Sequence, residues 1–152
     1  MHLHRLQRTQ ILPISSEESW VFFSDPGNLA RITPPWLDFQ VTSTPYLPMY
    51  AGQILTYGVA PLPGIRVSWT TEITHVTAPD FFVDEQRMGP YRFWHHQHFF
   101  IPHDQGTQMD DLVHYALPFW PFGELVHFEV RRRLNAIFDF RRAALVTIFG
   151  SL

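Results

Sequence analysis

The sequence predicts an α+β fold in which a curved antiparallel sheet of seven strands wraps around one long C-terminal helix, with two short helices after the first strand. Short strand-forming segments, separated by clusters of Pro, Gly and Asp, fill the chain from Leu37 to Leu117. From Gly123 to Leu152 the apolar residues recur every three or four positions, which is the period of an amphipathic helix. Because the sheet and the helix each have one apolar face, we expect these two faces to pack together.

The first part of the chain predicts one strand and then two short helices. A polar-rich alternation over Leu3–Leu12 is typical of an edge strand. Ser15 and Glu18 have the spacing of a capping box, so a short helix is expected to begin at this serine or the next residue. Asp25 and Pro26 supply the N-cap and the first position of a second short helix, which the prolines that follow it end.

Six further strands are expected in the centre of the chain, and they should pair as an antiparallel meander because their connections are short. The longest of these connections is Pro45–Gly52. No repeat or linker interrupts the pattern, so residues 1–152 are expected to form one domain. The predicted strands are Leu37–Thr44, Gln53–Ala60, Ile65–Thr77, Phe81–Met88, Tyr91–Pro102 and Thr107–Leu117.

The composition argues against a disordered chain, a nucleic-acid-binding protein and a membrane-spanning protein. Hydrophobic residues make up 45% of the chain and aromatic residues 16%, which is too apolar for disorder and rich enough in rings to fill or line a cavity. A net charge of -3 argues against nucleic acid as a partner. The longest purely apolar run, Ala116–Phe122, is too short to span a membrane. Since no secretory signal is visible, a cytoplasmic location is expected.

Two neighbouring predicted strands carry polar and aromatic side chains on one face. Asp84 and Gln86 lie two residues apart on the first strand. Trp94, His96 and His98 lie two apart on the second. Because successive side chains of a strand point to opposite faces, each set points to one side of the sheet. The sequence therefore predicts a face that mixes polar groups with rings.

The register of the next strand decides which residues join this face. If Asp104–Gly106 is a three-residue loop, His96 lies opposite His114. If the loop has two or four residues, Asp111 shares the face of His96 and His98. The second register gathers the apolar residues of this strand into one wall around the polar groups. We therefore predict that His98 faces Asp111.

Three chemical roles are open to these polar groups. They can chiefly satisfy one another and shape a pocket, since a buried polar group without a partner is costly. A histidine beside a carboxylate can instead move protons in a cyclisation or dehydration, which makes His98 and Asp111 the candidate catalytic pair. A metal site is not expected, because no third histidine is placed beside His96 and His98. No motif indicates a cofactor.

Three segments carry a resemblance to a known family: SDPGNLARITPPWLDF at 24–39, FVDEQRMGPYRFWHHQHFF at 82–100 and DDLVHYALPF at 110–119. Through them nearly the whole chain resembles the SRPBCC superfamily of START-like, helix-grip ligand-binding proteins, and within it the bacterial CoxG-like or cyclase/dehydrase-like branch. The resemblance implies a cavity between sheet and helix, bordered by loops at 60–65 and 118–124. It also implies binding or transport of a small hydrophobic molecule, lipid- or polyketide-like.

The resemblance leaves a polyketide cyclase or dehydratase-type enzyme and an interaction module without ligand as alternatives, because the superfamily hosts several functions on one scaffold. The segment Phe119–Phe122 either seals the core or forms an apolar patch that gates the cavity or touches a membrane transiently. The sequence carries no signal for an oligomeric state. The side chains expected to line the cavity are Trp69, Asp84, Gln86, Trp94, His96, His98, Asp111, Tyr115, Phe119 and Trp120.

Overall fold

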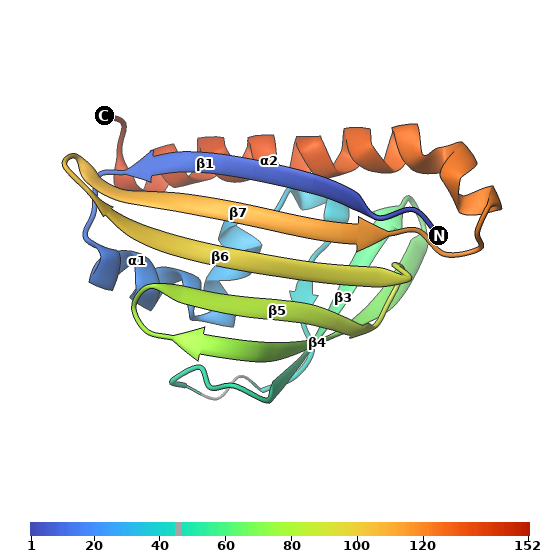
Figure 1. Cartoon of the computed structure of the whole chain (residues 1–152), viewed down its shortest axis with the longest axis horizontal. Coiled ribbons are helices and arrows are strands. Elements are labelled where there is room, and N and C mark those ends of the chain that lie inside the picture. Colours follow the sequence, from blue (N-terminus) through green and yellow to red (C-terminus); the bar gives the residue numbers. More distant parts are fainter. Residues whose placement is uncertain (45–46) are drawn as a thin grey trace.

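The computed structural model describes residues 1–44 and 47–152, and its elements follow the predicted order (Figure 1). Pro45 and Tyr46, which belong to the predicted connection Pro45–Gly52, lie outside the described residues. The elements are β1 (His4–Leu12), α1 (Ser16–Phe23), the 3-10 helices η1 (Pro26–Ile32) and η2 (Pro35–Leu37), β2 (Gln40–Val41), β3 (Gln53–Leu62), β4 (Ile65–Thr77), β5 (Phe81–Met88), β6 (Phe93–His103), β7 (Gly106–Ala116), the 3-10 helix η3 (Phe122–Val126) and α2 (His127–Phe149).

The strands form one sheet of seven in the order β1-β7-β6-β5-β4-β3-β2, and every neighbouring pair is antiparallel. β1 lies at one edge, as its polar-rich alternation predicts, and β2 to β7 form the predicted meander. Figure 1 shows the curved sheet with α2 running along it beside β1, while α1 and the 3-10 helices cover the same side. The helix-grip arrangement expected from the sequence is confirmed.

The two helix-start signals are confirmed at atomic detail. Ser15 Oγ accepts a hydrogen bond from the backbone N–H of Glu18 at 3.1 Å, and Glu18 Oε2 accepts one from the backbone N–H of Ser15 at 2.9 Å. Asp25 Oδ1 accepts from the backbone N–H of Gly27 at 2.9 Å. Each contact satisfies a backbone donor that the first turn of a helix leaves without an intrahelical partner.

The predicted strand Leu37–Thr44 is wrong over most of its length. Its first residue ends η2, and Asp38 then takes a left-handed conformation with φ 46° while its N–H donates to the carbonyl of Pro35. This tight turn delays pairing until β2, which has two residues. The C-terminal helix also differs from the prediction, because it begins as a 3-10 turn and α2 proper starts at His127.

The hairpin between β6 and β7 has a two-residue loop, because His103 pairs with Gly106. This register places His98 opposite Asp111, as predicted. Gly106 has a positive φ of 140°, and a Cβ at this position would lie 2.0 Å from the carbonyl oxygen of Leu12. A residue without a side chain is therefore required where the hairpin meets the end of β1.

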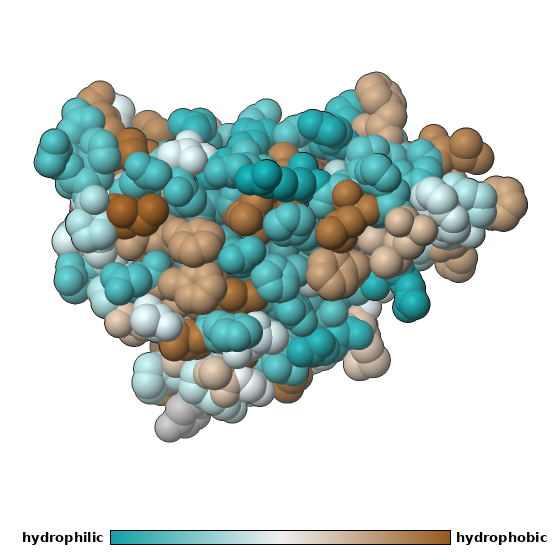
Figure 2. All heavy atoms as spheres, viewed as in Figure 1, coloured by the Kyte–Doolittle hydropathy of each residue, from teal (hydrophilic) through white to brown (hydrophobic). Residues whose placement is uncertain are grey.

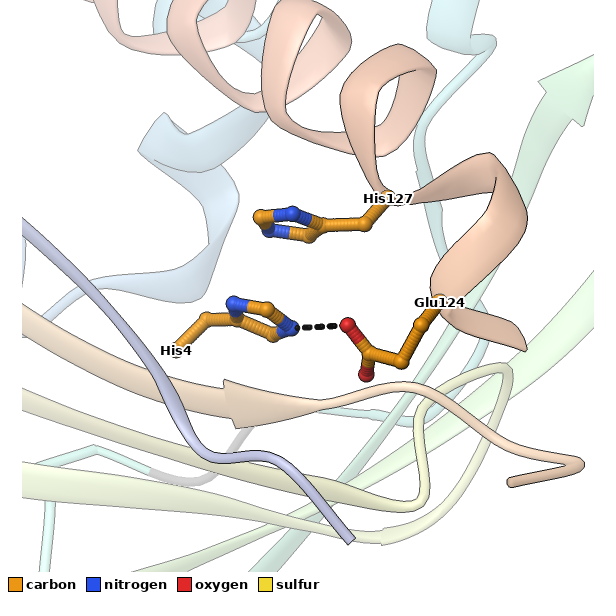
Figure 3. Close-up of side chains that lie close together, drawn as sticks. All are labelled: His4, Glu124 and His127. Atoms are coloured by element: carbon orange, nitrogen blue, oxygen red, sulfur yellow. Dashed lines mark hydrogen bonds and ion pairs between the residues drawn. The ribbon is translucent and has the colours of Figure 1, made fainter. Parts of the chain in front are cut away.

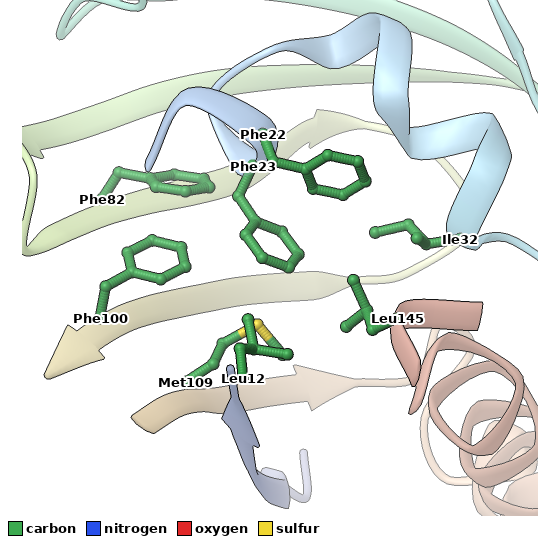
Figure 4. Close-up of a cluster of buried hydrophobic side chains, with 8 residues drawn as sticks. All are labelled: Leu12, Phe22, Phe23, Ile32, Phe82, Phe100, Met109 and Leu145. Carbon is green, nitrogen blue, oxygen red and sulfur yellow. The ribbon is translucent and has the colours of Figure 1, made fainter. Parts of the chain in front are cut away.

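The core is divided into clusters, and the polar face lies between two of them. The largest cluster closes the end of the molecule near α1 (Figure 4), and a second one joins β6 and β7 to α2. His96 and His98 lie on β6 between residues of the two clusters. The first cluster contains Leu12, Phe22, Phe23, Ile32, Phe82, Phe100, Met109 and Leu145, and the second contains Trp94, Val113, Tyr115, Leu117, Leu134 and Phe138.

Candidate functional site

A cavity of about 440 Å³ lies between the sheet, α2 and the 3-10 helices. This volume is in the range of roughly 300–1,000 Å³ that is typical of small-molecule pockets. Its polar side chains are few. The apolar lining includes Phe23, Leu29, Phe39, Leu55, Tyr57, Val59, Trp69, Ile73, Phe82, Tyr91, Trp94, Leu117, Leu134, Ile137 and Phe138, and the polar lining comprises Thr33, Thr71, Asp84, His96, His98, Arg133 and Arg141.

Two histidines and two carboxylates form a compact cluster on the sheet wall of the cavity, which we call the inner cluster: Asp84, His96, His98 and Asp111. His96 Nε2 lies 2.7 Å from Asp111 Oδ1, and His98 Nε2 lies 2.6 Å from Asp84 Oδ2. The two imidazole rings stack with their centroids 3.7 Å apart. Each ring also approaches the other carboxylate, since His98 Nδ1 lies 3.4 Å from Asp111 Oδ1 and His96 Nδ1 lies 3.8 Å from Asp84 Oδ2.

The hydrogen bonds of the inner cluster run diagonally across the strands. In the register, Asp84 is opposite His96 and Asp111 is opposite His98. The shortest contacts instead join His98 to Asp84 and His96 to Asp111. Diagonal neighbours on one face of a sheet are within reach of long side chains such as imidazoles. The predicted facing of His98 and Asp111 is therefore correct, but the closer carboxylate of His98 is Asp84.

Arg141 adds a positive charge to the inner cluster from α2, and the sequence reasoning missed it. Its Nη1 lies 3.8 Å from Asp111 Oδ1, and its guanidinium carbon lies 4.9 Å from the centroid of the Phe138 ring. Its Nε is buried and has no hydrogen-bond partner among the described residues. A signal was present, because Arg141 follows Leu134 by seven residues and precedes Leu145 by four, which places it on the buried face of the helix.

Burial and hydrogen bonding set the charges of the inner cluster. Burial raises the pKa of Asp84 and of Asp111, but hydrogen bonds from the histidines and the nearby positive charges outweigh it, so both pKa values lie below the ordinary range. Burial lowers the pKa of His98, but its bonds to both carboxylates raise it further than burial lowers it. Burial, with the charge of His98, lowers the pKa of His96. With Arg141, this arrangement favours a cluster whose charges balance.

Six of the predicted lining residues line the cavity, and four do not. Gln86 donates to the carbonyl of Tyr91 at 2.7 Å and accepts from its N–H at 3.0 Å, so it holds the connection between β5 and β6. Asp111 lies behind the histidines, Tyr115 is buried with its hydroxyl 3.0 Å from His127 Nε2, and Trp120 is exposed. Those that line it are Trp69, Asp84, Trp94, His96, His98 and Phe119.

Arg133 bridges the rim of the cavity, and the sequence reasoning also missed this role. Its Nη1 donates to the carbonyl of Pro61 at 2.8 Å, and its Nε donates to Glu129 Oε1 at 2.8 Å. Its guanidinium carbon lies 5.8 Å from the centroid of the Trp36 ring. Because Trp36 is 46% exposed and also lines the cavity, these contacts mark where the cavity reaches the surface.

The segment that joins β7 to α2, together with the first turn of α2, exposes six large apolar side chains, which we call the apolar end. Figure 2 shows hydrophobic groups projecting from this end of the molecule. The alternative that these rings seal the core is wrong, because Phe119 is 83% exposed. A Cβ on Gly123 would lie 2.1 Å from the carbonyl oxygen of Pro118, so a glycine is needed for the loop to fold this tightly. The apolar end consists of Phe119, Trp120, Phe122, Leu125, Val126 and Phe128.

Among the described residues, no helix combines the length and the apolar character needed to cross a membrane. The apolar end lies at the rim of the cavity. Phe119, Gly123 and Val126 line the cavity and belong to this segment, so the apolar end and the cavity are continuous.

Comparison with known proteins identifies the family. Residues 12–138 match the family described as polyketide cyclase / dehydrase and lipid transport. The chain belongs to this family. Membership of the SRPBCC superfamily, predicted from three segments of the sequence, is thereby confirmed, whereas the CoxG-like branch stays a prediction. No curated protein matches the chain.

Solved structures share the fold at low sequence identity. Protein Ms6760 from Mycobacterium smegmatis is 19% identical over 95% of this chain and 92% of its own, with a TM-score of 0.67. Protein CV1439 from Chromobacterium violaceum is 12% identical over 97% and 99%, with a TM-score of 0.73. Ara h 8.0201 is 12% identical over 96% and 99%, with a TM-score of 0.63. At these identities the likeness shows the fold alone.

Proposed function

We propose that the protein binds and carries a small, mostly apolar molecule that has one polar group, such as a lipid or a polyketide. The observation that carries this proposal is an apolar cavity of about 440 Å³ whose inner wall holds one compact polar cluster. The family description, which includes lipid transport, supports the same class of ligand. Apolar pockets with a few placed polar groups are the usual form of small-molecule sites.

The inner cluster predicts how the ligand is oriented. Arg141 Nε–H faces no acceptor among the described residues, and a buried donor without a partner costs about 1–3 kcal/mol. A carbonyl, hydroxyl or carboxylate oxygen of the ligand can accept from Arg141, which lines the cavity. The ligand therefore places its oxygen at the inner cluster and its apolar part against the rings.

The apolar end supports contact with a lipid surface during loading and release. Phe119 is 83% exposed and also lines the cavity, so an apolar molecule that leaves the cavity here meets an apolar surface. Exposed apolar patches of this kind are typical of membrane or protein contacts. Transient contact through Phe119–Phe122 and the residues that follow is part of the proposed function.

A second candidate function is a cyclase or dehydratase-type reaction at the same site. His98 Nε2 lies 2.6 Å from Asp84 Oδ2, and the two carboxylates raise the pKa of this histidine although burial opposes them. A protonated imidazole at the wall of an apolar cavity can act as a general acid on a ligand oxygen that replaces its longer contact, which is the 3.4 Å approach of Nδ1 to Asp111 Oδ1. In this candidate His98 is the acid, with Asp84 and Asp111 as the carboxylates that favour its charged form. The cavity itself argues against an interaction module without ligand.

The binding proposal is tested by native mass spectrometry of the freshly purified protein, followed by thermal shifts with fatty acids and polyketide aromatics. We expect a co-purified small molecule or a ligand-dependent rise in Tm, because a ligand that binds only the folded state stabilises it. Val130→Phe, which narrows the cavity from α2, should weaken binding roughly tenfold. Val146→Phe is the matched control, since Val146 lies on the same helix and is 41% exposed.

The outcomes separate the candidates. The binding proposal fails if no molecule co-purifies and no member of the panel shifts Tm. His98→Asn distinguishes the two functions, because it changes affinity alone in a carrier, whereas in an enzyme it abolishes turnover of a ligand that still binds.

A further inference from the structure

A second group of ligand-type side chains lies outside the cavity lining, where the start of β1 meets the start of α2 (Figure 3). His4 comes from β1, Glu124 from η3, and His127 is the first residue of α2. His4 Nε2 lies 2.9 Å from Glu124 Oε2, and the rings of His4 and His127 stack with centroids 3.5 Å apart. One ligand atom from each of the three residues lies within 4.8 Å of the others.

A tyrosine supports this group from the core. The hydroxyl of Tyr115, a residue that is 2% exposed, lies 3.0 Å from His127 Nε2. When the imidazole donates this hydrogen bond, its Nδ1 carries the lone pair that a metal ion binds. Such a partner on the second ring nitrogen is a regular feature of metal-binding histidines, because it fixes the tautomer and the orientation of the ring.

A fourth histidine lies beside this group, because the ring centroid of His2 is 4.4 Å from that of His4.

We propose that His4, Glu124 and His127 bind one divalent transition-metal ion of the zinc type. Two imidazoles and one carboxylate are a donor set that suits Zn²⁺ and leaves a fourth position for water. Mg²⁺ and Ca²⁺ prefer oxygen ligands and fit this set poorly.

Binding requires a local rearrangement that the structure allows. Ligand atoms lie roughly 2.0–2.2 Å from zinc, so the two stacked imidazoles must turn until their nitrogens converge on one point. His4 is the first residue of the edge strand β1, so its side chain can turn while the rest of the strand stays paired. The ion then ties β1 to η3, whose residues Gly123 and Val126 line the cavity, and so fixes the apolar end against the sheet.

The test is a zinc titration of untagged, chelator-treated protein by isothermal calorimetry. We expect one equivalent of Zn²⁺ to bind, no heat with Mg²⁺, and a rise in Tm with Zn²⁺. Glu124→Gln and His127→Gln should each weaken zinc binding at least about tenfold. His75→Gln is the control, because His75 is an exposed histidine on β4 and should leave the affinity unchanged.

A second measurement identifies the site when zinc does bind, because Asp84, His96 and His98 also bring one ligand atom each within 4.8 Å of the others. Co²⁺ in place of zinc gives visible absorption that reports its ligands. The proposal stands if the spectrum is lost in Glu124→Gln and kept in His98→Asn. It is overturned if the spectrum is kept in Glu124→Gln and His127→Gln, or if no zinc binds to the wild type. Neither result depends on the ligand of the cavity.

Discussion

The inner cluster and the apolar end depart from the usual distribution of side chains in opposite ways. At the inner cluster, charged groups are buried: Asp111 is 2% exposed and His98 is 9% exposed. At the apolar end, rings are exposed, with Phe119 at 83% and Phe128 at 80%. Buried charges and large exposed apolar patches are the two arrangements that folding alone does not favour. Both regions therefore point to function, and they lie on one cavity.

The two regions differ in how strongly the rest of the fold depends on them. Each carboxylate of the inner cluster contacts both histidines, so removing one group leaves others buried without a partner. The side chains of the apolar end project into solvent, so replacing them removes few contacts that stabilise the fold. Substitutions should therefore distinguish the two regions. At the inner cluster they should change the stability of the fold, and at the apolar end they should change binding to a lipid surface.

The largest expected effect on stability is that of Asp111→Ala. This change removes a buried carboxylate that contacts both His96 and Arg141. We expect the free energy of unfolding to fall by about 3–5 kcal/mol, because the partner that remains is a buried charge whose desolvation is no longer compensated. Urea unfolding measures this free energy. Asp110→Ala is the control, since Asp110 points to the other face and accepts from Thr9 Oγ1 in an exposed contact at 2.7 Å. Equal losses in both variants would contradict the dependence of the fold on the inner cluster.

The next effect is a loss of stability in acid. The pKa values of Asp84 and Asp111 lie below their ordinary value of 3.8, although burial opposes this, because histidine hydrogen bonds and positive charges favour the ionised form. Their contribution to the free energy of unfolding is present above about pH 4 and is lost as pH falls toward the lowered pKa values. His98 has a raised pKa, so its contribution is complete below about pH 6.5 and is lost as pH rises through the raised value.

Unfolding free energies measured in urea from pH 3 to 8 test this prediction. Asp84→Asn should flatten the acid side of the curve, because an amide has no proton to gain there. Asp139→Asn, at an exposed position of α2, is the control and should keep the wild-type slope. A wild-type curve that is flat below about pH 4 would show that the carboxyls are not held in the ionised form.

The sequence predicted those parts of the fold that depend on local chemistry or on a simple period. The capping box at Ser15, the N-cap at Asp25 and the bounds of β4 and β5 follow from residue types within a few positions of one another. The register of His98 against Asp111 was chosen because it gathers the apolar residues of the strand into one wall, while the length of the hairpin loop was left open. Local signals of this kind do not depend on the rest of the molecule.

The sequence failed where distant elements decide the outcome. The length of β2 was wrong because Asp38 adopts a left-handed turn that strand propensity does not reveal. The choice of Asp84 as the closer partner of His98 depends on the direction of a side chain across strands. The exposure of Phe119 depends on where a loop ends relative to the core, and composition alone favoured burial.

A smaller effect is expected at the rim of the cavity from Arg133→Ala. This change removes the hydrogen bond to the carbonyl of Pro61 and the contact with Trp36, which together are worth roughly 1–2 kcal/mol. Release of a fluorescent fatty acid, followed by stopped flow, should become roughly five- to tenfold faster. Arg132→Ala is the control, because Arg132 contacts Glu129 on the exposed face of the helix. The same release rate in both variants would show that Arg133 does not hold the rim.

The smallest effect on stability is expected from the double substitution Phe119→Ser and Phe128→Ser at the apolar end. Both rings are at least 80% exposed, so the free energy of unfolding should change by less than about 0.5 kcal/mol. Binding to phosphatidylcholine and phosphatidylglycerol vesicles, measured by cosedimentation, should weaken at least about tenfold, because each ring buried in lipid is worth roughly 1.5–3 kcal/mol. Val21→Ser is the control, since Val21 is 71% exposed on α1, away from the apolar end.

The combination of these two measurements decides what the apolar end is for. Weaker vesicle binding with unchanged stability assigns it to contact with lipid and leaves the inner cluster to hold the ligand. A loss of several kcal/mol in stability would instead mean that the rings pack against the body of the protein, and the contrast with the inner cluster would disappear. Unchanged vesicle binding in a stable variant would remove the lipid surface from the proposed function while leaving the cavity and its ligand untouched, because those rest on the interior of the sheet and α2.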